Sequence, residues 1–364
     1  MSKKEINVDL ETITPLWTGD AWQENIKIRP SSLMGSLRFW FEVICYFMGI
    51  LSKKDFDSKK GRFEEEVNQD EFKKKLKSNS TDVKSQIETL IEMNIPVPSI
   101  IFGTTGWRGL IEIKEIKPLY DYCFGNKLNL PGRICVSKVN ENVKENSDCS
   151  KRSDKDWSVF YFPNPYFYGI FEVKFLVEEE ILDSIFYPLL NFMDKYGYWG
   201  GKWNIGYGRL KAIEVKQNND TKDDWKNNKK FNFSFENKKD EGVDLSKYLE
   251  LVNSFDNLSQ IQGSNDKNIK ILCNQISNQN LKAVIKELIK IKAKERAKDK
   301  SNGGDTEKRH KIFGTTKKPP NNEDLLPQGS KILPYIKKEN GNYVGGFLSI
   351  VDLLELYEGG ERND

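Results

Sequence analysis

Histidine is almost absent from this sequence: His310 is the only one in 364 residues. Histidine is the side chain most often used for general acid–base catalysis. An enzyme built on this chain would therefore have to use carboxylates, lysine, tyrosine or a metal ion. The composition favours a binding protein over an enzyme.

Cysteine is scarce and follows no pattern. The cysteines are odd in number and include no CxxC pair: Cys45, Cys123, Cys135, Cys149 and Cys273. Structural zinc sites and disulfide frameworks use paired or evenly numbered cysteines. We therefore expect no disulfide framework, no metal and no cofactor, and a location in the reducing cytoplasm.

A hydrophobic run suited to a membrane span is also missing. The longest apolar stretch, residues 33–51, carries Arg38 and Glu42 near its middle, where a bilayer would disfavour both. The opening "MSKKEINVDLETIT" lacks the apolar centre of a signal peptide. The sequence predicts no membrane contact and a buried helix at this stretch.

Charge of one sign is not in excess. The 57 Lys and Arg residues nearly balance the 54 Asp and Glu residues, which leaves a net charge of +3. The field of the whole chain therefore argues neither for nor against nucleic acid as a partner. Any nucleic-acid site must be locally basic.

The hydrophobic pattern indicates an α+β protein. Alternation predicts strands at 5–14, 100–104, 110–116, 168–177 and 209–215, and helical periodicity predicts helices at 31–47 and 178–197. This order matches a ferredoxin-like βαββαβ plan. The chain length suits two tandem ferredoxin-like (RRM-like) domains, which we expect at 1–155 and 156–364.

Several other segments carry expectations. Residues 52–95 are highly charged and predict an insertion outside the core, with a helix at 84–93, and residues 216–230 predict a polar linker. The pentapeptide "IFGTT" occurs at 101–105 and 312–316, each time at an expected strand and turn, which favours a duplicated domain. A helix with one apolar stripe is predicted at 280–298, and a strand at 329–336.

Residues 197–208 form a glycine-rich loop, "GYWGGKWNIGYG". Glycines allow close approach of a phosphate chain to backbone N–H groups, which suggests contacts at Gly200, Gly201, Gly206 and Gly208. Lys202 and Arg209 add charge, and Trp199 and Trp203 offer faces on which unpaired bases can stack. The alternative is a structural hairpin whose tryptophans cover a domain interface. The spacing fits neither GxxxxGK[ST] nor GxGxxG, which disfavours a nucleotide site.

A second candidate site is the helix start in "NIKIRPSSLMGSLRFW". Free N–H groups at a helix N-terminus bind anions. The RNA-binding candidates here are Lys27, Arg29, Ser31, Ser32, Gly35 and Arg38. The alternative is an ordinary capped helix in which Arg38 pairs with Glu42 four residues later.

Four segments together resemble a known family: "TPLWTGD", "IRPSSLMGSLRFWF", "IFGTTGW" and "GYWGGKWNIGYGRL". They resemble the RAMP superfamily of CRISPR proteins, and within it the first subunit of the type III-B Cmr effector complex. The resemblance implies two ferredoxin-like domains and a non-catalytic subunit that binds guide RNA near its 3′ end and target single-stranded RNA, beside other RAMP subunits. It also implies an RNA contact at Arg108. The chain departs from the family at Asp20, where a second glycine is usual, and at Phe41 and Glu42, where a basic residue often follows the aromatic pair.

An endoribonuclease of the same superfamily is the alternative function. Asp20 could assist metal-dependent cleavage of target RNA, and His310 or a tyrosine could process guide RNA. A surface-loop aspartate and a solvated histidine are the simpler interpretations. The Lys-rich helix face between Lys282 and Lys300 is likewise either a hydrated surface or a contact for RNA phosphates.

Overall fold

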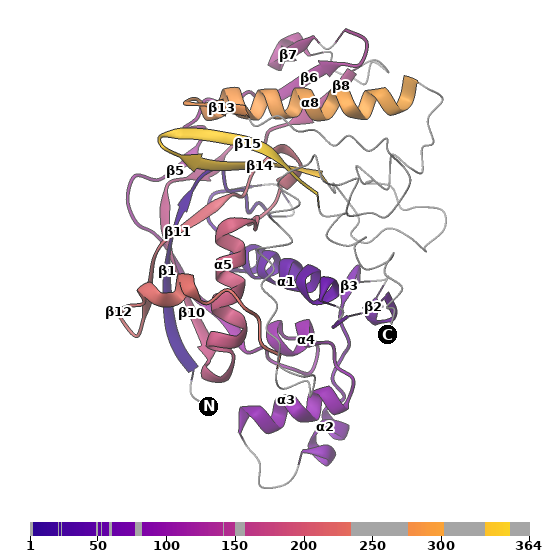
Figure 1. Cartoon of the computed structure of the whole chain (residues 1–364), viewed down its shortest axis with the longest axis vertical. Coiled ribbons are helices and arrows are strands. Elements are labelled where there is room, and N and C mark those ends of the chain that lie inside the picture. Colours follow the sequence, from indigo (N-terminus) through magenta and orange to yellow (C-terminus); the bar gives the residue numbers. More distant parts are fainter. Residues whose placement is uncertain are drawn as a thin grey trace.

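The computed structural model describes residues 3–20, 22, 24–48, 50–51, 53–57, 60–76, 82–140, 142–149, 157–233, 276–301 and 332–349. Its main element is an antiparallel five-stranded sheet in the order β12-β11-β1-β10-β4. The strands are β1 (Lys3–Thr12), β4 (Ile111–Pro118), β10 (Ile170–Glu178), β11 (Leu210–Gln217) and β12 (Asp220–Thr221). Helices α1 (Pro30–Phe47) and α5 (Tyr187–Lys195) lie on one face of this sheet (Figure 1).

The sheet confirms the ferredoxin-like plan. In chain order, β1, α1, β4, β10, α5 and β11 follow the βαββαβ sequence, and β1 and β10 form the central pair. The alternation predicted for the first strand is correct: Ile6, Val8 and Leu10 are buried on the helix side. Segments 198 residues apart in the sequence are thus joined, since Thr12 pairs with Leu210.

The domain boundary expected near residue 155 is wrong. A cut there would separate β1 and β4 from β10 and β11, which are hydrogen-bonded in one sheet. The polar stretch at 140–156 belongs to a connection between β4 and β10, so its composition marks an insertion. The first ferredoxin-like unit therefore extends from β1 to β11.

A second unit begins much later. It contains strand β13 (Ile276–Asn278), helix α8 (Leu281–Ser301), and strands β14 (Ile332–Glu339) and β15 (Asn342–Ser349). The three strands form a sheet in the order β13-β15-β14. This is the βαββ half of the same plan, in the same strand order. The apolar stripe predicted on the helix is confirmed, because all its members are buried: Leu281, Val284, Ile285, Leu288 and Ile289.

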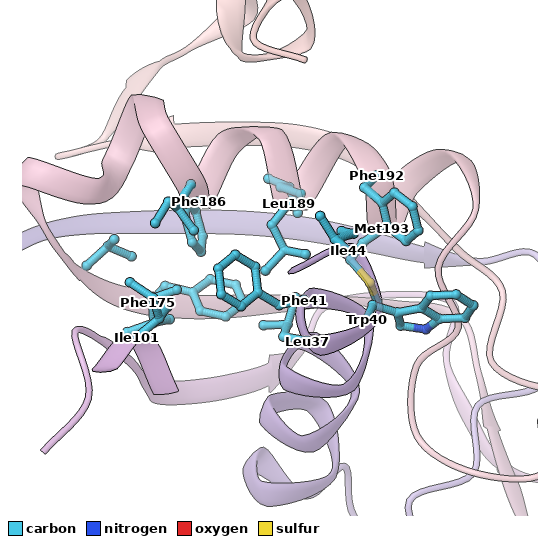
Figure 2. Packing of buried hydrophobic residues seen from close by; sticks show 14 of the residues in the cluster. Leu37, Trp40, Phe41, Ile44, Ile101, Phe175, Phe186, Leu189, Phe192 and Met193 are labelled. Carbon is cyan, nitrogen blue, oxygen red and sulfur yellow. The ribbon is translucent and has the colours of Figure 1, made fainter. Parts of the chain in front are cut away.

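The first core lies between the sheet and its two helices. Figure 2 shows Trp40, Phe41 and Ile44 of α1 meeting Leu189 and Met193 of α5, together with Phe175 of β10. Pro30 at the first helical position fixes the start of α1, as the sequence suggested. Helix α5 is preceded by a 3₁₀ turn (Glu179–Ile181) and one π-helical turn (Leu182–Phe186).

The charged segment 52–95 is not outside the core. It holds a 3₁₀ turn, a two-stranded ribbon and the first two helices beyond α1: Lys53–Asp55, β2 (Phe56–Asp57), β3 (Arg62–Phe63), α2 (Gln69–Lys75) and α3 (Val83–Glu92). The predicted helix at 84–93 is thus confirmed. Phe63, Val67 and Ile87 are buried and join the first core, so apolar residues spaced among the charges anchor the segment.

The strand predicted at 100–104 is wrong. Residues Val97–Phe102 form the short helix α4, with a proline in its first turn. All of its first five residues are buried, and an apolar run buried on every side has no periodicity that separates strand from helix. The first "IFGTT" copy is therefore a helix end, and the second copy, at 312–316, lies outside the described residues.

The connection between β4 and β10 forms two small sheets. One pairs β5 (Cys123–Gly125) with β9 (Tyr166–Tyr168), and the other has the order β7-β6-β8, from β6 (Arg133–Ser137), β7 (Val143–Glu145) and β8 (Trp157–Tyr161). A 3₁₀ turn, Asn146–Asp148, follows β7. Cys135 and Cys149 form a disulfide here, with 5.7 Å between their Cα atoms, although the cysteine pattern had argued against a disulfide framework. Their spacing of 14 residues along the chain gave no sign of this proximity.

The stretch 216–230 is more than a polar linker. After β12 it forms a 3₁₀ turn, Asp223–Asn227, and buries Trp225, whose backbone oxygen accepts a hydrogen bond from Asn191 of α5. One tryptophan among charged residues thus fastens the segment to the first unit. None of the described helices is both long enough and apolar enough to span a bilayer.

The face of the main sheet away from α1 and α5 is charged. Asp9 in β1 pairs across the sheet with Glu172 on one side and Glu214 on the other, so three carboxylates form one row. The next row holds Asn7 between Lys174 and Lys216. Burial raises the pKa of Asp9. The neighbouring carboxylates of Glu172 and Glu214 raise this pKa further, and Lys216 partly opposes the shift.

Asp9→Asn is therefore expected to stabilise the protein at neutral pH by about 1 kcal/mol, since like charges opposite each other in a sheet are destabilising. The folded state favours the protonated form of Asp9. Ionised Asp9 therefore destabilises the fold as pH rises above the usual aspartate range, and this destabilisation disappears below about pH 4. Urea unfolding of both proteins at about pH 7 and about pH 4 measures this. Glu5→Gln is the control: Glu5 pairs with Lys174 at 3.1 Å, so its loss should not stabilise. An equal gain for both variants would contradict the interpretation.

Candidate nucleic-acid interface

Trp199 is not a base-stacking platform. It is 1% exposed and belongs to the first core together with Tyr198. Trp203 is half-buried and stacks on Trp40 of α1, with 5.8 Å between ring centroids, and also contacts Phe39. Protein rings thus make the contacts that we predicted for RNA bases, and the prediction for Trp199 is wrong.

Arg209 is also a structural residue. Its guanidinium is buried and donates to the backbone oxygens of Asp194, Lys195 and Gly197, where α5 ends, and to Ile336 of β14. It also lies over the ring of Tyr335, 4.7 Å from the centroid. A cation at a helix C-terminus is stabilised by the helix dipole. The predicted contact with RNA phosphates is therefore wrong.

The glycines of the loop serve close packing. Gly208 has φ +92°, and a Cβ there would lie 2.2 Å from the backbone oxygen of Trp199. At Gly206, with φ +87°, the nearest neighbour is Pro334 of the second unit. The Tyr198 hydroxyl also donates to the oxygen of Pro334, at 3.0 Å. The alternative interpretation, a hairpin that covers a domain interface, is correct for this part of the loop.

Arg38 is buried as well. Its guanidinium lies 2.8 Å from Glu42 and 3.3 Å from Glu64, and it donates to the backbone oxygens of Phe63 and Gly103. The i,i+4 pair proposed as the alternative is thus confirmed, and the RNA contact is wrong. Burial raises the pKa of Glu42, although Arg38 opposes that shift. The charge at position 38 holds α1 against the 52–95 segment.

The start of α1 remains open. Lys27, Ser31 and Gly35 are exposed, and Arg29 and Ser32 are half-exposed. Arg29 is the N-cap residue, and no side chain caps the helix. A Cβ at Gly35 would meet no atom within 4 Å. The positive end of the helix dipole therefore faces solvent among cationic side chains.

The glycine-rich loop borders this helix start. Gly200 donates its N–H to Ser36 Oγ of α1 at 2.9 Å, and Gly201 donates to the oxygen of Trp17 at 2.8 Å. Lys202 has a left-handed backbone, φ +66°, and its ammonium lies 4.8 Å from the centre of the Trp17 ring. Gly201 and Lys202 are half-exposed. We call the exposed and half-exposed group formed by Lys27, Arg29, Ser31, Ser32, Gly35, Gly201 and Lys202 the α1-start surface.

The loop before α1 is fastened internally. Thr18 donates its N–H to Asn25 Oδ1 at 2.9 Å, and its hydroxyl donates to the oxygen of Lys27. Asp20 Oδ2 lies 2.6 Å from Arg29, and Asp20 Oδ1 accepts from the backbone N–H of Trp22. Thr18 and Asn25 were not among the predicted site residues, although "TGD" and "QEN" are typical turn formers.

These bonds bear on the nuclease alternative. Both oxygens of Asp20 are used inside the loop, and the described residues contain no group of three potential metal ligands from His, Cys, Asp and Glu. Two donors are left over: Trp17 Nε1 and Arg29 Nε are buried and have no acceptor among the described residues. Unsatisfied N–H dipoles add positive potential beside the α1-start surface. His310 lies outside the described residues.

Arg108 is not part of this surface. It is exposed and forms an ion pair with Glu112 of β4. Glu112 also lies 3.8 Å from Lys3 at the beginning of β1, whereas the glycine-rich loop joins the sheet at Thr12, where β1 ends. The fold therefore places Arg108 at the opposite end of the sheet.

The second unit contacts the glycine-rich loop through a lysine of α8. Lys292 of α8 is buried and donates to the oxygens of Asn204, at 3.2 Å, and Ile332 of β14, at 2.6 Å. Burial, with a smaller effect of Arg296, lowers the pKa of Lys292 to about 7. Lys282 and Lys286 of the same helix approach Glu145 of β7. Part of the Lys-rich face predicted for RNA or solvent is thus used in packing.

The charged sheet face gives no RRM-type binding platform. RRM proteins stack bases on aromatic side chains of the sheet. Here the central strands present Glu5, Asp9, Glu11, Glu172 and Lys174 instead. Carboxylates repel phosphates, so the α1-start surface is the better candidate for RNA.

The strand order and the open helix start define an α+β protein of ferredoxin-like units with a cationic surface. The family model of the RAMP superfamily matches residues 9–211, which coincide with the first unit and make up more than half of the chain. The chain belongs to the RAMP superfamily.

Other comparisons are more distant. No curated protein sequence matches this chain. It is similar to a chain of the type III-B Cmr-beta complex bound to cognate target RNA, with 12% identity, a TM-score of 0.42, and coverage of 98% of this chain and 99% of that chain. It is also similar to Cmr1 from Pyrococcus furiosus, with 15% identity, a TM-score of 0.37, and coverage of 96% and 92%.

Proposed function

We propose that this chain is a non-catalytic RNA-binding subunit of a type III-B CRISPR (Cmr-type) complex, in the cytoplasm, near the 3′ end of the guide RNA and in contact with target RNA and other RAMP subunits. Membership of the RAMP superfamily supports this proposal. The observation that carries it is the α1-start surface, where an uncapped helix N-terminus lies beside the exposed Lys27 and the half-exposed Arg29 and Lys202.

The α1-start surface suits a ribose-phosphate strand. Pro30 has no N–H, and the N–H groups of Ser32 and Leu33 donate to the backbone oxygen of Arg29, so the Ser31 N–H is the first-turn donor that can reach a phosphate oxygen. The absence of a side chain at Gly35 leaves room for the strand. Lys27, just before α1, and Lys202, in the glycine-rich loop, supply positive charge. Selection of sequence is left to pairing between guide and target, so these contacts need to recognise only the backbone.

Lys27→Ala combined with Lys202→Ala is expected to weaken single-stranded RNA binding roughly 10-fold, equally for unrelated sequences, because both lysines neutralise phosphates. The slope of log affinity against log salt should fall by about 0.7 for each lysine. Fluorescence anisotropy with labelled RNA over a salt series measures both quantities. Incubation with Mg²⁺ should leave the RNA uncut.

The matched control is Lys114→Ala combined with Lys117→Ala. Both lysines are exposed on β4, at the sheet edge away from the glycine-rich loop. This variant removes the same charge and should retain most of the affinity. Equal losses for the two double variants would mean that binding follows net charge and would contradict the assigned surface. Cleavage abolished by Asp20→Ala would support the nuclease alternative instead.

A further inference from the structure

The loop before α1 exposes an apolar surface made by two side chains. Trp22 is 84% exposed, and Ile26, four residues later, is 65% exposed. Burying an indole ring is strongly favourable, so a ring held in water is available for a partner. Both residues lie between Asp20 and Lys27, directly beside the α1-start surface.

The backbone around this ring is held in place. The N–H of Trp22 donates to Asp20 Oδ1 at 2.9 Å, and the N–H of Glu24 donates to the same oxygen at 3.0 Å. The other oxygen of Asp20 is paired with Arg29, the N-cap of α1. A ring on an anchored loop loses less conformational entropy on binding than a ring on a free loop.

The charges around the ring indicate the chemistry of its partner. Lys27 is exposed and Arg29 is half-exposed, and Arg29 neutralises Asp20. Glu24 is the exposed carboxylate beside Trp22. A flat apolar ring next to a cationic helix start is the combination that binds single-stranded nucleic acid, in which phosphates meet the charges and an unpaired base stacks on the ring.

We propose that Trp22, supported by Ile26, stacks an unpaired base of the RNA strand whose phosphates lie on the α1-start surface. This inference rests on the proposed function and adds to it the selection of single-stranded over double-stranded RNA at this position. A paired base inside a duplex has no free face for the indole ring, so a duplex gains only the phosphate contacts.

The test compares a labelled oligoadenylate of about 12 nucleotides with a blunt RNA duplex of the same length. Trp22→Ala should weaken binding of the single strand roughly 10-fold, leave the salt slope unchanged and leave duplex affinity unchanged. Trp22→Phe should restore most of the affinity because it keeps a stacking ring. Tyr161→Ala removes another exposed ring, on β8, and should have no effect.

The outcomes separate this inference from the proposed function. Single-strand affinity of Trp22→Ala equal to that of the wild type would overturn the inference, and would indicate that the ring serves a protein partner. Equal losses on single strand and duplex would also overturn it. A wild-type protein that binds neither RNA would overturn both the inference and the proposed function.

Discussion

Replacing Arg209 with alanine is expected to lower the free energy of unfolding by at least about 3 kcal/mol, because buried carbonyl groups lose their donor at a cost of roughly 1–3 kcal/mol each. The guanidinium satisfies three oxygens at the end of α5 and one of β14. The Arg209 side chain therefore caps the C-terminal end of α5 and also joins the two ferredoxin-like units. Thermal unfolding followed by differential scanning fluorimetry should show a large fall in the midpoint.

A matched control separates structure from RNA binding. Lys211 is the exposed cation two residues further along β11, and Lys211→Ala should unfold close to the wild-type midpoint. Arg209→Lys keeps the charge but lacks the fork that reaches several carbonyls, so it should also be destabilised. An Arg209→Ala protein with wild-type stability and weakened RNA binding would show that the residue contacts phosphate after all.

Opposite charges at Gly35 are expected to change RNA affinity in opposite directions. Gly35→Glu places a carboxylate in the middle of the α1-start surface and should weaken single-stranded RNA binding at least roughly 10-fold, whereas Gly35→Lys should strengthen it. The site tolerates both side chains, since a Cβ meets no atom within 4 Å. Both residues are also better helix formers than glycine, so neither should unfold α1.

Gly35→Ala provides the reference for this pair. It should stabilise the protein by about 0.5–1 kcal/mol, as alanine does in an exposed helix interior, and leave affinity close to that of the wild type. Titration of labelled RNA at low salt compares the three variants directly. A loss of affinity in all three would mean that the strand needs the space above Gly35, and equal affinities would exclude RNA from this surface.

The sequence predicted the elements whose pattern is local. Alternation located β1, β10 and β11, and the apolar stripe located α8, because each strand or helix faces one buried side. The helix start of α1 was also recognised, from Pro30 and the serines that follow it.

What failed depends on contacts between distant segments. Arg209 and Trp199 have the composition of an RNA site, and only the fold shows that Arg209 lies between α5 and β14 and that Trp199 is buried in the first core. The same holds for Arg38, whose partner Glu64 lies in an insertion, and for the disulfide between Cys135 and Cys149. The boundary near residue 155 failed because a change in composition marks an insertion as readily as a linker.

The most direct test of the account is the position of RNA on the protein. Photocrosslinking of a single-stranded RNA that contains 4-thiouridine, followed by mass spectrometry of the attached peptides, locates the contact. Crosslinks should fall on the loop and helix start at 17–35 and on residues 201–203, which border the α1-start surface. Crosslinks confined to the charged sheet face, on β1 and β10, would contradict the account.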